Sequence, residues 1–178
     1  MIDPKLKGRI ALVTGANHGI GASIAKALAK QGVKVFITYL RGSNVDKWSE
    51  PLFVQNQSRT ADYIVEEIGK NGGKVDAIEA DLSDFSTIKK LFDKVEKVFG
   101  PVEILVNNAA YCNPDTFTPQ TSFVEEKTGA TSDTISPENY ERHFAVNTRA
   151  PVFLIEEFAK RHVARKAKWG RIINISTD

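Results

Sequence analysis

Strand-like apolar runs alternate with segments of helical periodicity along most of the chain. In the helical segments apolar residues recur at every third or fourth position, most clearly over 88–99. Other helices are expected over 20–29 and 61–68, and a long one after Ser136, which can cap it with Pro137 at the first position. The apolar runs predict five strands, at 10–14, 33–39, 75–80, 102–106 and 171–175.

This strand–helix alternation predicts an α/β fold, because parallel neighbouring strands need crossover connections that helices usually supply. We expect residues 1–178 to form one domain, a Rossmann-type doubly wound parallel sheet with helices on both faces that stops after the fifth strand. Two segments, 40–57 and 111–135, exceed ordinary connection lengths and follow strand ends, the edge where open α/β sheets bind ligands. For 40–57 an insertion without function is an equal alternative, whereas 111–135 is interpreted as a lid over a substrate.

Composition and charge exclude several classes of protein. The net charge is only +2 and the basic residues are spread along the chain, so no surface for nucleic acid or membrane is expected. No apolar run approaches the roughly 20 residues of a membrane-spanning helix. The charged first nine residues do not resemble a signal peptide, and the single cysteine, Cys112, cannot form an internal disulfide. We therefore expect a cytoplasmic protein, and we predict no metal site.

A glycine-rich turn, 14–21, lies between the first strand and the first helix and reads Thr-Gly-Ala-Asn-His-Gly-Ile-Gly. Glycines let the backbone approach a ligand closely, and a helix start offers unpaired N–H groups and a positive dipole end. The turn predicts that amides beside Gly15, Gly19 and Gly21 bind a diphosphate, although a purely structural turn remains an alternative. Because the Lys-Ser/Thr ending of a P-loop is absent, hydrolysis of a nucleoside triphosphate is not expected.

The spacing of these glycines resembles the cofactor motif of the classical short-chain dehydrogenase/reductase family. Further resemblances follow in order: Asp-Leu at 81–82, Asn-Asn-Ala-Ala at 107–110 for the family's Asn-Asn-Ala-Gly, Ala-Val-Asn at 145–147, and 170–176. The resemblance implies hydride transfer between a nicotinamide and a small-molecule carbonyl or alcohol, and 3-oxoacyl-carrier-protein reductases are among such enzymes. It implies cofactor contacts at Gly15, Asn17, His18, Gly19, Ile20, Gly21, Tyr39, Arg41, Asp81, Leu82, Asn108, Ala109 and Ala110.

The end of the second strand bears on the choice of cofactor. Relatives that prefer NAD usually carry an acidic residue where Tyr39 stands, and Arg41 follows two residues later with a guanidinium suited to a phosphate. His18 adds slight support, because relatives that use NADP often have a basic residue there. We therefore expect NADP(H), with NAD(H) possible and a solvated Arg41 as the alternative.

The resemblance also implies part of a catalytic apparatus. Asn147 would support a proton-relay water, and either Ser176 or Thr177 would supply the hydroxyl that orients the substrate oxygen. The family's Tyr-x-x-x-Lys motif is missing, since none of the four tyrosines has a lysine four residues later. The 178-residue chain is thus expected to be inert and to be part of a longer enzyme; the alternative is a non-catalytic NAD(P)-binding regulator.

Three features of the long helix complete these expectations. Pro151 cannot donate to the carbonyl of Asn147, so the helix should bend there and release that oxygen, unless the proline serves packing alone. Phe153, Leu154 and Phe158 are either core residues or a subunit interface, and the resemblance implies a homodimer or homotetramer. The basic residues that follow are expected to form a solvated face; they are Lys160, Arg161, Arg165, Lys166 and Lys168.

Overall fold

A five-stranded parallel sheet forms the centre of the molecule in a computed structural model of the chain, which describes residues 4–42, 58–113, 115–117, 122–124 and 131–176. The order is β3-β2-β1-β4-β8, and all four pairs of neighbours are parallel. The α/β fold class and the Rossmann-type sheet are confirmed. The strands are β1 (Ile10–Val13), β2 (Lys34–Tyr39), β3 (Lys74–Glu79), β4 (Ile104–Asn107) and β8 (Arg171–Asn174).

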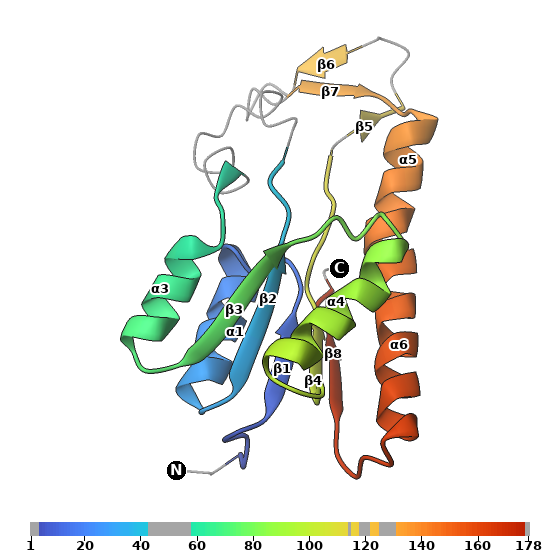
Figure 1. Cartoon of the computed structure of the whole chain (residues 1–178). Helices are drawn as coiled ribbons and strands as arrows, with labels where there is room; N and C mark the ends of the chain where they lie inside the picture. The colour runs from blue at the N-terminus through green and yellow to red at the C-terminus, as the bar shows by residue number, and fades with distance from the viewer. Residues whose placement is uncertain (1–3, 43–57, 114, 118–121, 125–130, 177–178) are drawn as a thin grey trace.

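Helices cover both faces of this sheet (Figure 1). Ala11 and Val13 of β1 belong to a core cluster with α1 (Gly19–Lys30) and α3 (Asp62–Lys70). The alternate residues of β1, Ile10 and Leu12, belong to a second cluster with α4 (Ser86–Val98) and α6 (Ala150–Ala164), in which Leu154 and Phe158 are buried. All four β1 residues are buried, as expected for a parallel strand enclosed on both faces.

The segment 111–135, interpreted from the sequence as a lid over a substrate, contains a second small sheet. Its strands are β5 (Asp115–Thr116), β6 (Ser122–Val124) and β7 (Thr131–Thr134), in the order β5-β7-β6. The small sheet lies beyond the end of the main sheet at which the parallel strands finish (Figure 1). Most of 40–57, the other long segment, lies outside the described residues.

The expected long helix is interrupted. The Ser136 hydroxyl caps α5 (Pro137–Phe144) by accepting a hydrogen bond from the Asn139 amide at 3.1 Å, which confirms the predicted helix start. A π-helical turn, η2 (Ala145–Arg149), then joins α5 to α6, with the Ala150 amide donating to the Ala145 carbonyl five residues back. Pro151 is the second residue of α6, just after this turn, so the irregularity expected near the proline takes the form of a widened helical turn.

Arg161 of α6 is not part of a solvated face. Its side chain is 16% exposed, and it donates to Glu157, Glu96 and Asp93 at 2.7, 2.7 and 2.6 Å. Since Asp93 and Glu96 belong to α4, the guanidinium joins the two helices on this face of the sheet. No helix among the described residues has the length and apolar character needed to cross a bilayer.

Candidate functional site

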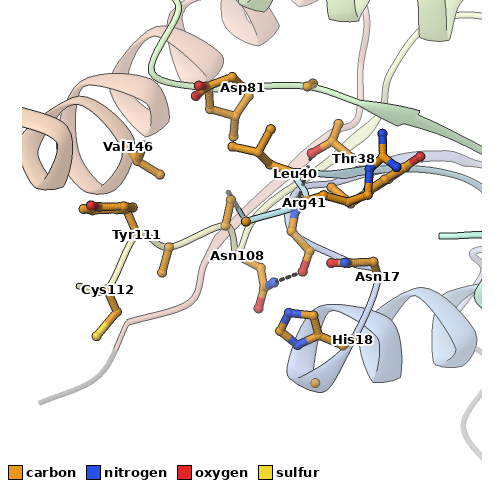
Figure 2. A pocket seen from close by; sticks show the side chains of 18 of the residues that line it. Asn17, His18, Thr38, Leu40, Arg41, Asp81, Asn108, Tyr111, Cys112 and Val146 are labelled. Carbon is orange, nitrogen blue, oxygen red and sulfur yellow. Dashed lines mark hydrogen bonds between the residues drawn. The ribbon is translucent and has the colours of Figure 1, made fainter. Parts of the chain in front are cut away.

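A cavity of about 460 Å³ opens at the carboxyl ends of β1, β2, β3 and β4. It is lined by every residue predicted to contact the cofactor except Gly21. Figure 2 shows Asn17 and His18 entering from the turn before α1, Arg41 from the end of β2, and Asp81 from beyond β3. The segments that follow β1, β2, β3 and β4 meet here with Arg142 of α5 and Val146 of η2, so five chain segments line one site.

The start of α1 provides the part of this cavity best suited to an anion. Gly19 has a φ of +58°, and a Cβ added there would meet no atom within 4 Å, so the backbone faces open space. The N-cap residue, His18, makes no side-chain cap hydrogen bond. Because the first amides of a helix have no acceptor within it, the amides of Gly19, Ile20 and Gly21 are placed to bind a phosphate group.

The other two glycines of the turn serve close packing. The Gly15 amide donates to the Thr38 hydroxyl at 3.4 Å, so it is not directed at an open anion site as the sequence suggested. A Cβ on Gly15 would lie 2.7 Å from the Ala109 Cα, and one on Gly21 would lie 2.4 Å from both the Asn108 Nδ2 and the Gly15 carbonyl oxygen. These two positions bring the turn against the segment after β4.

Thr14 and Asn108 lock the turn to that segment. The Thr14 Oγ1 accepts hydrogen bonds from the amides of Asn108 and Ala109, both at 3.0 Å. In return the Asn108 Nδ2 donates to the carbonyls of Thr14 and Gly15 at 3.0 and 2.8 Å, from the position seen in Figure 2. The Asn108 side chain thus fixes the turn that carries the predicted diphosphate site.

Basic groups gather at the end of the cavity where His18 and Arg41 lie. The buried Asn17 side chain donates to the Arg59 carbonyl at 2.9 Å, which holds Arg59 near His18. Burial, and secondly the positive charge of Arg59, lower the pKa of His18, so its imidazole is neutral at pH 7. Sequence reasoning missed Arg59, because only the fold brings it to the glycine turn.

Asp81 is engaged by two partners. Its Oδ1 accepts from the Ser83 amide and hydroxyl at 2.8 and 2.7 Å, and its Oδ2 accepts from Arg142 of α5 at 3.2 Å. The Arg142 guanidinium also lies 5.3 Å from the ring centroid of Tyr111, and both residues line the cavity. Arg142 carries no motif that could have marked it in the sequence.

At the other end of the cavity Asn147 holds the backbone of Tyr111. The Asn147 Oδ1 accepts from the Tyr111 amide, and its Nδ2 donates to the Tyr111 carbonyl, both at 2.8 Å. The Tyr111 hydroxyl donates to the Asn139 Oδ1 at 3.0 Å. Val146, the neighbour of Asn147 on η2, lines the cavity and points toward Tyr111 (Figure 2).

Asn147 is not itself among the lining residues and borders the cavity only through Tyr111. Ser176 is exposed after β8 and is not among the lining residues, and Thr177 lies outside the described residues. Among the residues that the structure describes, no group of three or more His, Cys, Asp or Glu side chains is arranged to hold a metal ion.

The two hydrogen bonds between the Asn147 side chain and the Tyr111 backbone, here called the Tyr111 clamp, lead to a prediction. Asn147→Ala removes both hydrogen bonds, each contributing about 1 kcal/mol, so the Tyr111 amide should exchange its hydrogen about ten-fold faster or more. Hydrogen exchange followed by NMR measures this rate. Asn147→Asp retains the acceptor for that amide and should preserve most of the protection; equal rates in the wild type and the alanine variant would contradict the clamp.

Comparisons with known proteins agree on one family. The family model described as short chain dehydrogenase matches residues 9–178. A versicolorin reductase of Emericella nidulans is 34% identical over 174 residues, covering 98% of this chain and 53% of the relative. An NADPH-dependent aldehyde reductase of Arabidopsis thaliana is also 34% identical, covering 97% of this chain and 57% of its own length.

Solved structures give the same result. A metagenomic short-chain oxidoreductase in complex with NADP superimposes with a TM-score of 0.70 at 30% identity, covering 97% of this chain and 64% of the other. A 3-oxoacyl-(acyl-carrier-protein) reductase of Agrobacterium tumefaciens with NADP bound has a TM-score of 0.71 at 27% identity, with coverages of 97% and 54%. The chain spans about half the length of the curated relatives it matches.

Proposed function

The chain belongs to the short-chain dehydrogenase family, and from that membership we propose that it binds NADP(H) in preference to NAD(H) for reduction of a small-molecule carbonyl or oxidation of the matching alcohol. A 3-oxoacyl thioester is one candidate substrate class. The observation that carries the proposal is the cavity at the strand ends, where the free first turn of α1 meets His18, Arg41 and Asp81.

The residues present fit a dinucleotide. The first-turn amides of α1 would take the diphosphate, Arg41 with His18 would face the phosphate on the adenosine ribose, and Asp81 with Leu82 would contact the adenine. The open space beside Gly19 supports this arrangement, since no side chain of the described residues occupies it. The NADP carried by two solved relatives supports the preference for the phosphorylated cofactor.

A bound nicotinamide supplies or accepts the hydride. Within this chain, Asn147 fixes the backbone of Tyr111 at the cavity wall, and we propose that Ser176 or Thr177 orients the substrate oxygen. The reaction is proposed for the whole protein, because this chain corresponds to about half of its relatives and none of its tyrosines has a lysine four residues later. The part described here would be the cofactor-binding half.

Two further proposals concern the whole protein. The exposed side chains of Val152 and Val163 on α6, at 55% and 73%, support a homodimer or homotetramer. The exposed free thiol of Cys112 supports a reducing, cytoplasmic location.

Titration with NADPH and NADH tests the cofactor proposal. We expect NADPH to bind this chain more tightly than NADH, as followed by the change in fluorescence of the reduced nicotinamide. An excess of oxidised NADP, which is not fluorescent, should displace the bound NADPH. Absence of binding by both dinucleotides would overturn the proposed function; tighter binding of NADH would overturn only the preference for NADP(H). An intact protein that binds NADPH but has no Tyr-x-x-x-Lys motif would instead favour a non-catalytic regulator.

A further inference from the structure

Glu79, the last residue of β3, engages the arginine that faces the cofactor site. It lies opposite Tyr39 in the register of β2 and β3. Tyr39 is the last residue of β2, and Arg41 follows it two residues later, beyond the strand. Its carboxylate accepts hydrogen bonds from the Arg41 amide at 3.1 Å, from Nε at 3.1 Å and from Nη2 at 2.8 Å. Among the described residues, the hydrogen-bond acceptors of the Arg41 side chain are the two oxygens of this one carboxylate.

We propose that Glu79 is a specificity-determining residue: its charge offsets that of Arg41 and thereby weakens the preference of this site for a cofactor with a ribose 2′-phosphate. The inference rests on the proposed function, and it concerns a residue that lies outside the cavity lining and acts through Arg41.

The geometry explains how the charge acts. Glu79 bonds the Nε and Nη2 edge of the guanidinium, so a phosphate bound at the remaining N–H groups would lie across one planar group from the carboxylate. That separation falls within the Debye length of about 8 Å at physiological ionic strength, so the two anions repel each other. Hydrogen bonds from Arg41 hold the pKa of Glu79 below its ordinary value, so the carboxylate is ionised at neutral pH.

Orientation and charge have opposite consequences, and the chain allows them to be separated. Glu79 also fixes the orientation of the Arg41 guanidinium. This effect by itself would favour phosphate binding, because the arginine side chain then loses less conformational freedom when the phosphate binds. Glu79→Gln keeps a carbonyl oxygen that can accept from Arg41 but removes the charge. Glu79→Ala removes both, so the glutamine variant isolates the electrostatic effect.

The test measures binding of four probes, 2′,5′-ADP, 5′-ADP, NADPH and NADH, by calorimetry and fluorescence. We expect Glu79→Gln to tighten 2′,5′-ADP and NADPH by about five-fold, the scale of one exposed charge interaction, and to leave 5′-ADP and NADH within two-fold. The gain should shrink as salt is raised. Glu66→Gln, which neutralises an exposed partner of Lys70 on α3, is the matched control and should change nothing.

An Arg41→Ala background shows whether Glu79 acts through the arginine. There, the five-fold gain from Glu79→Gln should fall to two-fold or less, because the guanidinium that links carboxylate and phosphate is gone. If Glu79→Gln binds 2′,5′-ADP as the wild type does or more weakly, the inference is overturned. The proposed function would still stand in that case, provided that the wild type binds NADPH. Binding of no dinucleotide by any variant would overturn both.

Discussion

Replacing Gly21 with alanine should lower the free energy of unfolding by about 2–4 kcal/mol and abolish dinucleotide binding. The added methyl group would lie 2.4 Å from the Gly15 carbonyl oxygen and the Asn108 Nδ2, and 2.9 Å from the Ala16 Cα. Two of these three atoms are backbone, so relief requires the glycine turn to move away from the start of α1. Denaturant unfolding measures the first effect and NADPH titration the second.

Gly69→Ala is the matched control for that substitution. Gly69 lies on the exposed side of α3, where a Cβ would meet no atom within 4 Å. Alanine there should be neutral or should stabilise by up to about 1 kcal/mol, because glycine is the poorer helix former. If both variants unfold at the same denaturant concentration as the wild type, the conclusion that Gly21 is too closely packed to accept a methyl group is wrong.

Arg161→Ala should destabilise the chain by about 2–3 kcal/mol. The Glu157 side chain is only 9% exposed, and the substitution leaves its buried carboxylate without the cation that lies closest to it. The same substitution removes the link from α6 to Asp93 and Glu96 of α4. The guanidinium also lies 5.5 Å from the Phe92 ring centroid, so packing is lost together with charge. Chemical denaturation measures the change.

Lys160→Ala provides the comparison for this second substitution. The Lys160 ammonium lies 3.6 Å from the same Glu157, but its side chain is 66% exposed. Exposed pairs contribute little, so we expect a change below about 0.5 kcal/mol. A loss for Lys160→Ala as large as that for Arg161→Ala would show that general loss of positive charge on α6, and not the buried network, is responsible.

The fold was predictable because its signals are local. The continuous apolar runs of the parallel strands and the helical spacing of Ile88, Leu91 and Phe92 both appear in the sequence. The structure buries these three helix residues and the residues of β1 and β4, whereas β8 at the edge of the sheet is exposed. Boundaries were less accurate: β4 begins at Ile104, not at Val102, although Val102 is buried. The short strands β5, β6 and β7 were missed because two to four residues give too short a period to detect.

Partners that depend on tertiary contacts were not predictable from the sequence. Glu79 and Arg142 carry no motif, and their roles follow only from the register of β3 with β2 and from the packing of α5 near Asp81. Arg161 was grouped with solvated lysines, because its position near a helix end does not reveal that two acidic residues of α4 lie beside it. The sequence indicated the predicted cofactor contacts that line the cavity, whereas the structure adds Arg142 to the lining and supplies what each residue is bonded to.

The four residues from Asn108 to Tyr111 are anchored at both ends, to Thr14 and Gly15 at one and to Asn147 at the other. This short span therefore fixes the distance between the glycine turn and the π-helical turn of η2. A substitution at Ala109, Ala110 or Tyr111 changes the lining of the cavity but keeps the two anchors at their separation, because the bonds at those positions are made by the backbone. An insertion or deletion would instead shift one anchor out of register, so the length of this segment is constrained more strictly than its composition.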